Sequence, residues 1–196
     1  IVSCPLGNGS SLCAVDHGRS MDTTMGFTPV EGLIMGTRCG DVDAGVITFL
    51  ERTAGLTVPQ IDELINKKSG LLGLSGISSD MREILTAAEA GESRALIALK
   101  TYCYRIRKYI GAYVAAMGGL DAVVFTGGVG QGSAMVRALA LQGLDCMRIR
   151  IDEQLNRDAR GFDEVCRISA NDSKVAVLVV PTDEERMMAR EALKAL

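Results

Sequence analysis

The chain has 196 residues, of which 47% are apolar and 23% are charged. This composition is typical of a globular protein and excludes a disordered or collagen-like chain. Lysine and arginine number 21 against 24 aspartates and glutamates, so the basic excess of a nucleic-acid-binding protein is absent. The six cysteines form no C-x-x-C pair and there is one histidine. We therefore expect reduced thiols, a cytoplasmic protein, no structural zinc site and, without a long apolar run, no membrane span.

The start of the chain predicts β-strands. Residues 1–4 are a short apolar run with no methionine before it, which indicates a strand already under way in a piece of a longer protein. Residues 12–15 and 19–23 flank Asp16-His17-Gly18, the pattern of a β-hairpin.

The middle of the chain predicts one loop region followed by helices. Residues 25–45 are rich in glycine, threonine and proline and predict an ordered loop, with a short helix over 29–35. Helices are expected from Pro59 to the residues before Gly70, from Met81 to Gly91, and over 92–117. The expected core positions of the longest helix are Ala95, Leu96, Leu99, Cys103, Ile106, Ile110, Val114 and Met117.

The last third alternates strands and helices. A buried strand over 122–125 leads into a glycine-rich loop over 126–133 and then a helix to about residue 142. A second buried strand over 175–180 precedes a helix over 183–196. We expect a capping box from Thr182 and Glu185, and core positions at Met187 and Met188. The order of elements predicts one α/β domain, with a mixed sheet covered by helices.

Two glycine-rich loops each follow an apolar strand, at 7–11 and at 127–133. Glycines allow backbone N–H groups to approach a phosphate closely, although tight turns without a ligand remain an alternative. The spacings G-x-G-x-x-G, G-x-x-x-x-G-K-[ST], G-x-S-x-G and H-E-x-x-H are all absent. Dinucleotide-dependent dehydrogenases, P-loop NTPases, esterases and zinc proteases are therefore disfavoured.

Between these loops, Arg38 lies in the segment G-T-R-C-G-D. A guanidinium in a glycine-rich loop suits bidentate binding of anionic oxygens, and the alternative is a surface ion pair with Asp41 or Asp43. Asp80 precedes a helix, where a carboxylate ordinarily complements the helix dipole.

Taken in order along the chain, these motifs resemble the acetate kinase family. The segments that carry the resemblance are P-L-G-N-G-S-S (5–11), M-G-F-T-P-V-E-G (25–32), M-G-T-R-C-G (35–40), S-S-D-M-R (78–82), F-T-G-G-V-G (125–130) and P-T-D-E-E (181–185). The resemblance implies that residues 1–196 are the C-terminal nucleotide-binding domain of an acetokinase, whose N-terminal domain is absent from this chain. The implied fold is a ribonuclease-H-like domain of the acetate and sugar kinase/Hsp70/actin superfamily, a mixed sheet flanked by helices.

The resemblance also implies an activity: reversible transfer of the ATP γ-phosphate to acetate or propionate, giving acyl phosphate and ADP, with Mg²⁺, in a homodimer. This half is expected to be inactive alone. Arg38 resembles the catalytic arginine, Pro29 part of the acyl pocket, and Glu184 the Mg²⁺-associated glutamate. The residues that resemble the nucleotide-binding set are Pro5, Leu6, Gly7, Asn8, Gly9, Asp80, Met81, Arg82, Gly128, Val129, Gly130, Gln131 and Gly132.

Three segments depart from the family pattern. Pro5 stands where the family has a histidine, Gln131-Gly132 stands where the family has Glu-Asn, and T-D-E-E (182–185) stands where the family has T-N-E-E, a mild change. Proline has no N–H donor and a fixed φ angle. The alternative hypothesis is a degenerate nucleotide-binding or dimerisation module without kinase turnover.

Overall fold

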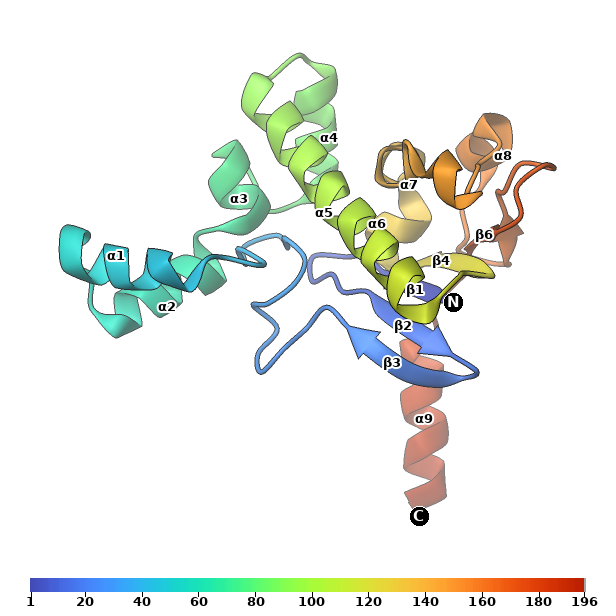
Figure 1. Ribbon diagram of the computed structural model, residues 1–196, viewed down its shortest axis with the longest axis horizontal. Coiled ribbons are helices and arrows are strands. Elements are labelled where there is room, and N and C mark those ends of the chain that lie inside the picture. The colour runs from blue at the N-terminus through green and yellow to red at the C-terminus, as the bar shows by residue number, and fades with distance from the viewer. Residues whose placement is uncertain (196) are drawn as a thin grey trace.

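The computed structural model describes the backbone of residues 1–195 and, within them, all side chains except those of residues 184 and 195. Its centre is a mixed sheet with the strand order β3-β2-β1-β4-β6-β5 (Figure 1). The strands are β1 (Val2–Pro5), β2 (Cys13–Asp16), β3 (Arg19–Thr23), β4 (Ala122–Thr126), β5 (Cys166–Arg167) and β6 (Ala176–Val179). The central strands β1, β4 and β6 are parallel, and β2, β3 and β5 pair antiparallel at the two sides.

The structure confirms the strands that the sequence predicts. They form because their apolar side chains are buried in the core. Val123 and Phe125 of β4 and Val177 and Val179 of β6 are fully buried. The hairpin is confirmed as well, with Asp16 paired to Arg19 across the turn, and His17 at its tip is exposed.

Some helices pack on this sheet and others extend away from it (Figure 1). They are α1 (Ala44–Ala54), α2 (Val58–Lys67), α3 (Gly70–Ser75), α4 (Met81–Glu89), α5 (Ser93–Met117), α6 (Gly127–Gly132), α7 (Ala134–Leu141), the 3-10 helix η1 (Leu144–Met147), α8 (Glu153–Asp158) and α9 (Glu184–Ala195). The long helix α5 lies across the sheet in Figure 1, and its buried side chains share one core with those of β1 and β4. Its predicted core stripe is confirmed from Ala95 to Ile110, except for Leu96, which is exposed.

The helix predicted over 29–35 is wrong, because this segment is an ordered loop without helical hydrogen bonds. Its backbone groups bond to distant segments instead: the Gly32 amide donates to Asp41 Oδ1 at 2.8 Å, and the Gly36 amide donates to the Asn8 carbonyl at 2.9 Å. Further helices, α1, α3 and α8, were not predicted from the sequence, and part of the glycine-rich loop forms the short helix α6.

The last helix also differs from its prediction. Asp183, not Thr182, caps α9 by accepting a hydrogen bond from the Arg186 amide at 3.0 Å. Met187 and Met188 are exposed rather than part of the core, because α9 extends away from the sheet (Figure 1). The final predicted residue of the helix, 196, lies outside the described residues.

The expectation of reduced thiols is confirmed, because all six cysteines are free. Cys4 and Cys103 are buried in the core, where desolvation raises the pKa of both thiols and keeps them protonated. Among the helices that the structure describes, none combines the length and the apolar character that a membrane crossing requires.

Arg137 of α7 is fully buried and joins α6 to α8. Its guanidinium donates to the carbonyls of Gly130 at 2.9 Å and Gln131 at 2.7 Å, to the Asn156 carbonyl at 2.7 Å and side chain at 2.8 Å, and to the Ala159 carbonyl at 3.3 Å. Burial lowers the pKa of Arg137 to about 10, so the group is still a cation at neutral pH. One side chain thus supplies the hydrogen-bond donors for four carbonyls at the ends of α6 and α8.

Replacing Arg137 should destabilise the protein strongly. We expect Arg137→Met in the full-length protein to lower the free energy of unfolding by about 3 kcal/mol, because several buried acceptors lose their donor. Arg137→Lys should recover only part of this loss, since an ammonium group cannot span both helix ends. Denaturant titration measures the difference.

The matched control is Arg19→Met on the exposed edge strand β3, which should change stability by no more than about 0.5 kcal/mol. Equal stability of the Arg137→Met variant and the control would contradict the role of Arg137.

Candidate functional site

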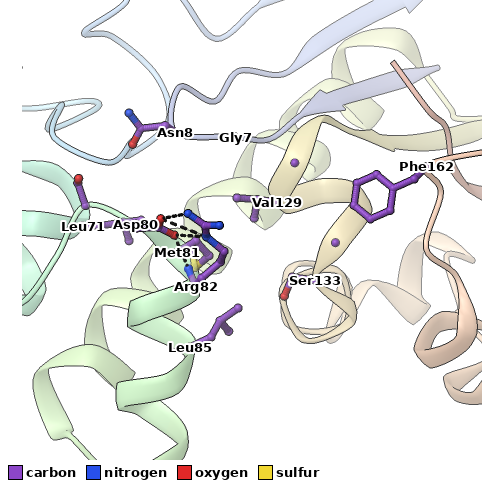
Figure 2. Close-up of a pocket in the computed structure, with 13 residues that line it drawn as sticks. Gly7, Asn8, Leu71, Asp80, Met81, Arg82, Leu85, Val129, Ser133 and Phe162 are labelled. Carbon is purple, nitrogen blue, oxygen red and sulfur yellow. Dashed lines mark hydrogen bonds and ion pairs between the residues drawn. The ribbon is translucent and has the colours of Figure 1, made fainter. Parts of the chain in front are cut away.

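A cavity of about 660 Å³ opens where the ends of β1 and β4 face the beginning of α4 (Figure 2). In parallel sheets, ligands commonly bind at the carboxyl ends of the strands. The lining residues come from the loop after β1, from α3, α4 and α6, and from the segment after α8. They are Gly7, Asn8, Leu71, Ser79, Asp80, Met81, Arg82, Leu85, Gly128, Val129, Gly132, Ser133 and Phe162.

The loop after β1 offers unused backbone donors to this cavity. Gly7 donates its amide to the Gly9 carbonyl at 3.0 Å, which closes a tight turn. Asn8 and Gly9 are exposed, and within the described part of the chain their amides donate no hydrogen bond. Free, clustered N–H groups of this kind suit an anionic ligand.

In the second glycine-rich segment, α6, some amides are already bonded, whereas those of Gly127 and Gly128 donate no hydrogen bond within the described residues. The amides of Val129 and Gly130 both donate to the Leu6 carbonyl, at 2.9 and 3.1 Å. Gly127 has φ +75°, and a Cβ at this position would come within 2.6 Å of the same carbonyl oxygen, so only glycine fits. Gly128 borders open space. Helix α6 therefore presents Gly128, Val129 and Gly132 to the cavity, and its role as a phosphate-binding loop stays a prediction.

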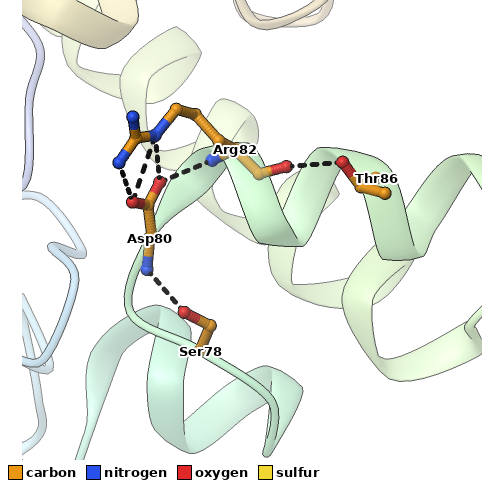
Figure 3. Close-up of polar contacts among 4 residues, drawn as sticks. All are labelled: Ser78, Asp80, Arg82 and Thr86. Atoms are coloured by element: carbon orange, nitrogen blue, oxygen red, sulfur yellow. Dashed lines mark hydrogen bonds and ion pairs between the residues drawn. The ribbon is translucent and has the colours of Figure 1, made fainter.

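Asp80 caps α4 at the edge of the cavity (Figure 3). Its carboxylate accepts the Arg82 amide at 2.8 Å and pairs with the Arg82 guanidinium, whose Nε lies 3.1 Å from each oxygen. These hydrogen bonds lower the pKa of Asp80 to about 2, so the pair stays charged at neutral pH. Ser78 accepts the Asp80 amide at 3.0 Å and fixes the turn before the helix. The dipole-complementing role expected for Asp80 is confirmed, and Met81 beside it is buried.

Arg38 lies close to the first glycine-rich loop. Its Nη1 is 3.4 Å from Met35 Sδ, and Met35 Sδ is 4.0 Å from where a Cβ of Gly9 would be. The segment is held by α3, since the amides of Ser69 and Leu71 donate to the carbonyls of Thr37 and Met35. The half-buried Arg38 is thus on a fixed loop and reaches the neighbourhood of Gly9 through Met35, although it does not line the cavity.

The alternative reading of Arg38 as an ion-pair partner of Asp41 or Asp43 is wrong for the residues that the structure describes. Asp41 instead pairs with Arg105, accepts from the Tyr109 hydroxyl at 2.7 Å, and accepts the Gly32 amide. Asp43 caps α1 by accepting the Gly45 amide at 2.7 Å.

The structure brings most of the predicted nucleotide-binding set together. Those that line the cavity are Gly7, Asn8, Asp80, Met81, Arg82, Gly128, Val129 and Gly132; those that do not are Pro5, Leu6, Gly9, Gly130 and Gln131. Leu6 and Gly130 are buried behind the cavity wall. Gln131 is also buried, and its Nε2 donates to Thr182 Oγ1 at 3.2 Å.

Sequence reasoning did not assign five lining residues: Leu71, Ser79, Leu85, Ser133 and Phe162. Ser79 and Ser133 lie within or next to the recognised motifs and could have been found from them. Leu71 and Phe162 have no local signal, because their position depends on tertiary contacts.

The remaining predicted residues lie outside this cavity's lining. Pro29 is exposed on the loop before α1, and the side chain of Glu184 lies outside the described residues. Within the described residues, no three histidine, cysteine, aspartate or glutamate side chains come together as a metal site.

Comparison with known proteins agrees with this geometry. The model of the Acetokinase family matches residues 1–190. The chain is 52% identical, over all its 196 residues, to the acetate kinases of Dictyoglomus turgidum and Phocaeicola vulgatus, and covers 48% of each. The acetate kinase structure from Porphyromonas gingivalis matches with a TM-score of 0.93 and 50% identity, covering 98% of this chain and 48% of that one. A propionate kinase from Francisella tularensis matches with a TM-score of 0.90 and 38% identity, covering 97% and 48%.

The chain spans about half the length of the relatives that it matches, and that half is the C-terminal one. The expected fold is confirmed, since the mixed sheet flanked by helices is shared with acetate and propionate kinases of the acetate and sugar kinase/Hsp70/actin superfamily. The family match over residues 1–190 and the 52% identity to acetate kinases over the whole chain lead to one conclusion: this chain belongs to the Acetokinase family.

Proposed function

We propose that the full-length protein containing this chain is an acyl kinase that transfers the γ-phosphate of ATP reversibly to acetate or propionate, giving acyl phosphate and ADP. Residues 1–196 are its C-terminal nucleotide-binding domain, and the N-terminal domain of the same protein completes the cleft, so this half alone is inactive. The observation that carries the proposal is that three of the family's motifs, at 5–11, 78–82 and 125–130, line one cavity, while Arg38 contacts Met35, a neighbour of Gly9 in the first loop.

The nucleotide lies along the cavity in this proposal. Its phosphates bind the amides of Asn8 and Gly9, which donate no hydrogen bond among the described residues, and its nucleoside lies between α4 and α6. Arg82 stands at the rim with an exposed side chain. The buried residues Leu6, Gly130 and Gln131 act indirectly, by holding the two loops in place.

The chemistry needs little more than alignment and charge neutralisation. A carboxylate oxygen of the acyl substrate attacks the γ-phosphorus, the bond to the bridging oxygen breaks, and ADP leaves. The guanidinium of Arg38 stabilises the negative charge on the transferring group by bidentate hydrogen bonds. Pro29, exposed on its loop, forms part of the acyl pocket once the N-terminal domain covers it.

The donor set of this half fits a magnesium ion that is held chiefly by the nucleotide. Mg²⁺ commonly keeps several waters and binds one or two carboxylates together with substrate phosphates. The described residues accordingly lack a cluster of three protein ligands. Glu184 at the start of α9 is the proposed carboxylate. A Mg²⁺ ion held by Glu184 and the nucleotide would supply charge neutralisation at the phosphates. A cytoplasmic location stays a prediction.

Arg38→Lys should lower kcat about a hundredfold or more, because an ammonium cannot replace a planar, bidentate guanidinium at the transferring phosphoryl group. The measurement is acyl phosphate formed by the full-length protein from ATP with acetate or propionate. Arg52→Lys, at the exposed end of α1, is the matched control and should keep the wild-type rate. An unchanged kcat for Arg38→Lys contradicts the role of Arg38, and a wild-type protein that forms no acyl phosphate contradicts the kinase proposal.

Pro5→His and the natural protein should both be active. Pro5 is the last residue of β1 and does not line the cavity. The pairing of β1 with β2 ends at Ser3, so the missing N–H of Pro5 removes no bond from that ladder. The same acyl phosphate assay compares the two proteins.

Activity in the Pro5→His variant alone would instead support the second candidate function. In that case the natural protein is a nucleotide-binding or dimerisation module without kinase turnover. This is the alternative hypothesis suggested by the sequence differences from the family at Pro5 and Gln131.

We also propose that the full-length protein is a homodimer formed largely through this half. Exposed apolar side chains on the described surface, among them Phe27, Phe49 and Val58, provide area that a second copy would cover. Sedimentation velocity should give twice the mass of one chain. A monomer at micromolar concentration would contradict the dimer without affecting the assignment of the nucleotide site.

A further inference from the structure

Phe162 is an aromatic residue in the wall of the cavity, and none of the motifs discussed above includes it. Its side chain is 55% exposed, yet it lines the same space as residues of α4 and α6. Its Cζ lies 3.7 Å from the position of a Cβ on Gly132. In Figure 2 the ring lies beside α6, and the residues of α4 lie on the other side of the view.

The backbone before Phe162 is held by long-range contacts. Gly161 has φ +60°, and a Cβ there would come within 2.2 Å of Val179 Cγ1 in strand β6, so the chain passes directly against the sheet. Two residues earlier, the Ala159 carbonyl accepts from the buried Arg137. The ring is therefore exposed on a backbone that is fixed just before it, at a point where it borders the cavity.

The other lining residues of the cavity indicate which kind of ligand the Phe162 ring would contact. Its apolar lining residues besides Phe162 are Leu71, Met81, Leu85 and Val129, and α6 adds the side-chain-free surface at Gly128 and Gly132. Among the described residues, the unbonded amides of the two glycine-rich segments lie in the loop after β1 and at the start of α6, whereas Phe162 lies beside Gly132 at the end of α6. A ligand that fits both parts has a charged group and a flat apolar group.

We propose that Phe162 binds the base of the phosphoryl donor by stacking, so that this protein selects a nucleoside triphosphate over an inorganic polyphosphate. The inference rests on the proposed nucleotide site and adds the residue that recognises the nucleoside. Because every base has a π-face, stacking on one ring tolerates purines in general. Phe162 thus sets the class of donor rather than the identity of the base.

Calorimetry on the full-length protein with Mg²⁺ tests this assignment, with ATP and inorganic tripolyphosphate as the two probes. Phe162→Ala should raise the Kd of ATP about tenfold, within the range measured for loss of one base–aromatic contact, and leave the Kd of tripolyphosphate unchanged. Phe162→Trp should keep tight ATP binding. Tyr104→Ala, which removes another exposed aromatic side chain on α5 outside the cavity, is the matched control and should bind ATP as the wild type does.

The outcomes separate this inference from the proposed function. Unchanged ATP affinity in Phe162→Ala, or an equal loss for both probes, overturns the stacking role while the kinase proposal stands. Tight, Phe162-dependent ATP binding in a protein that forms no acyl phosphate supports the stacking role and contradicts the kinase. Equal melting temperatures of the variants exclude loss of folding as the cause.

Discussion

The main-chain carbonyl of Leu6 is the acceptor on which the candidate site depends. It receives the amides of Val129 and Gly130 at the end of β4, while the Leu6 amide donates to the Thr126 carbonyl at 2.8 Å. Two segments separated by more than a hundred residues are thereby fixed as one wall. Because parallel strands place their carboxyl ends at the same edge, the pairing of β1 with β4 brings these groups within reach, and the left-handed Gly127 lets the chain turn over the carbonyl.

The same wall is held from behind by Arg137. This buried cation has carbonyl partners rather than a carboxylate, so its desolvation is offset by several charge-assisted hydrogen bonds to helix ends. Its partners belong both to α6 and to the segment that leads to Phe162. A single side chain therefore couples the glycine surface of the cavity to its aromatic edge, and the cavity keeps its shape without a large lining of rigid side chains.

Sequence patterns could predict the parts of this fold whose residues face a core. The strands over 122–125 and 175–180 alternate with helices whose apolar spacing matches buried faces. Helix α1 could not be found in this way. None of its residues is buried, so its sequence does not need apolar residues at helical spacing. The loop over 29–35 was misread as helical because its backbone bonds reach Asn8 and Asp41, which are local neighbours only in the folded chain. Phe162 was missed for the same reason, since contacts with β6 and α7 place it.

The distribution of unused donors gives the proposed nucleotide one orientation. The amides of Val129 and Gly130 are already bonded to Leu6, so among the described residues around the two loops the phosphates are left to the amides of Asn8 and Gly9 and to those of Gly127 and Gly128 at the start of α6. Arg38 lies on that side through its contact with Met35. The base then points toward the wall formed by α4, α6 and Phe162, where polar donors are few. The γ-phosphate consequently faces Arg38 and the loop that carries Pro29, which is the side that an acyl substrate must enter.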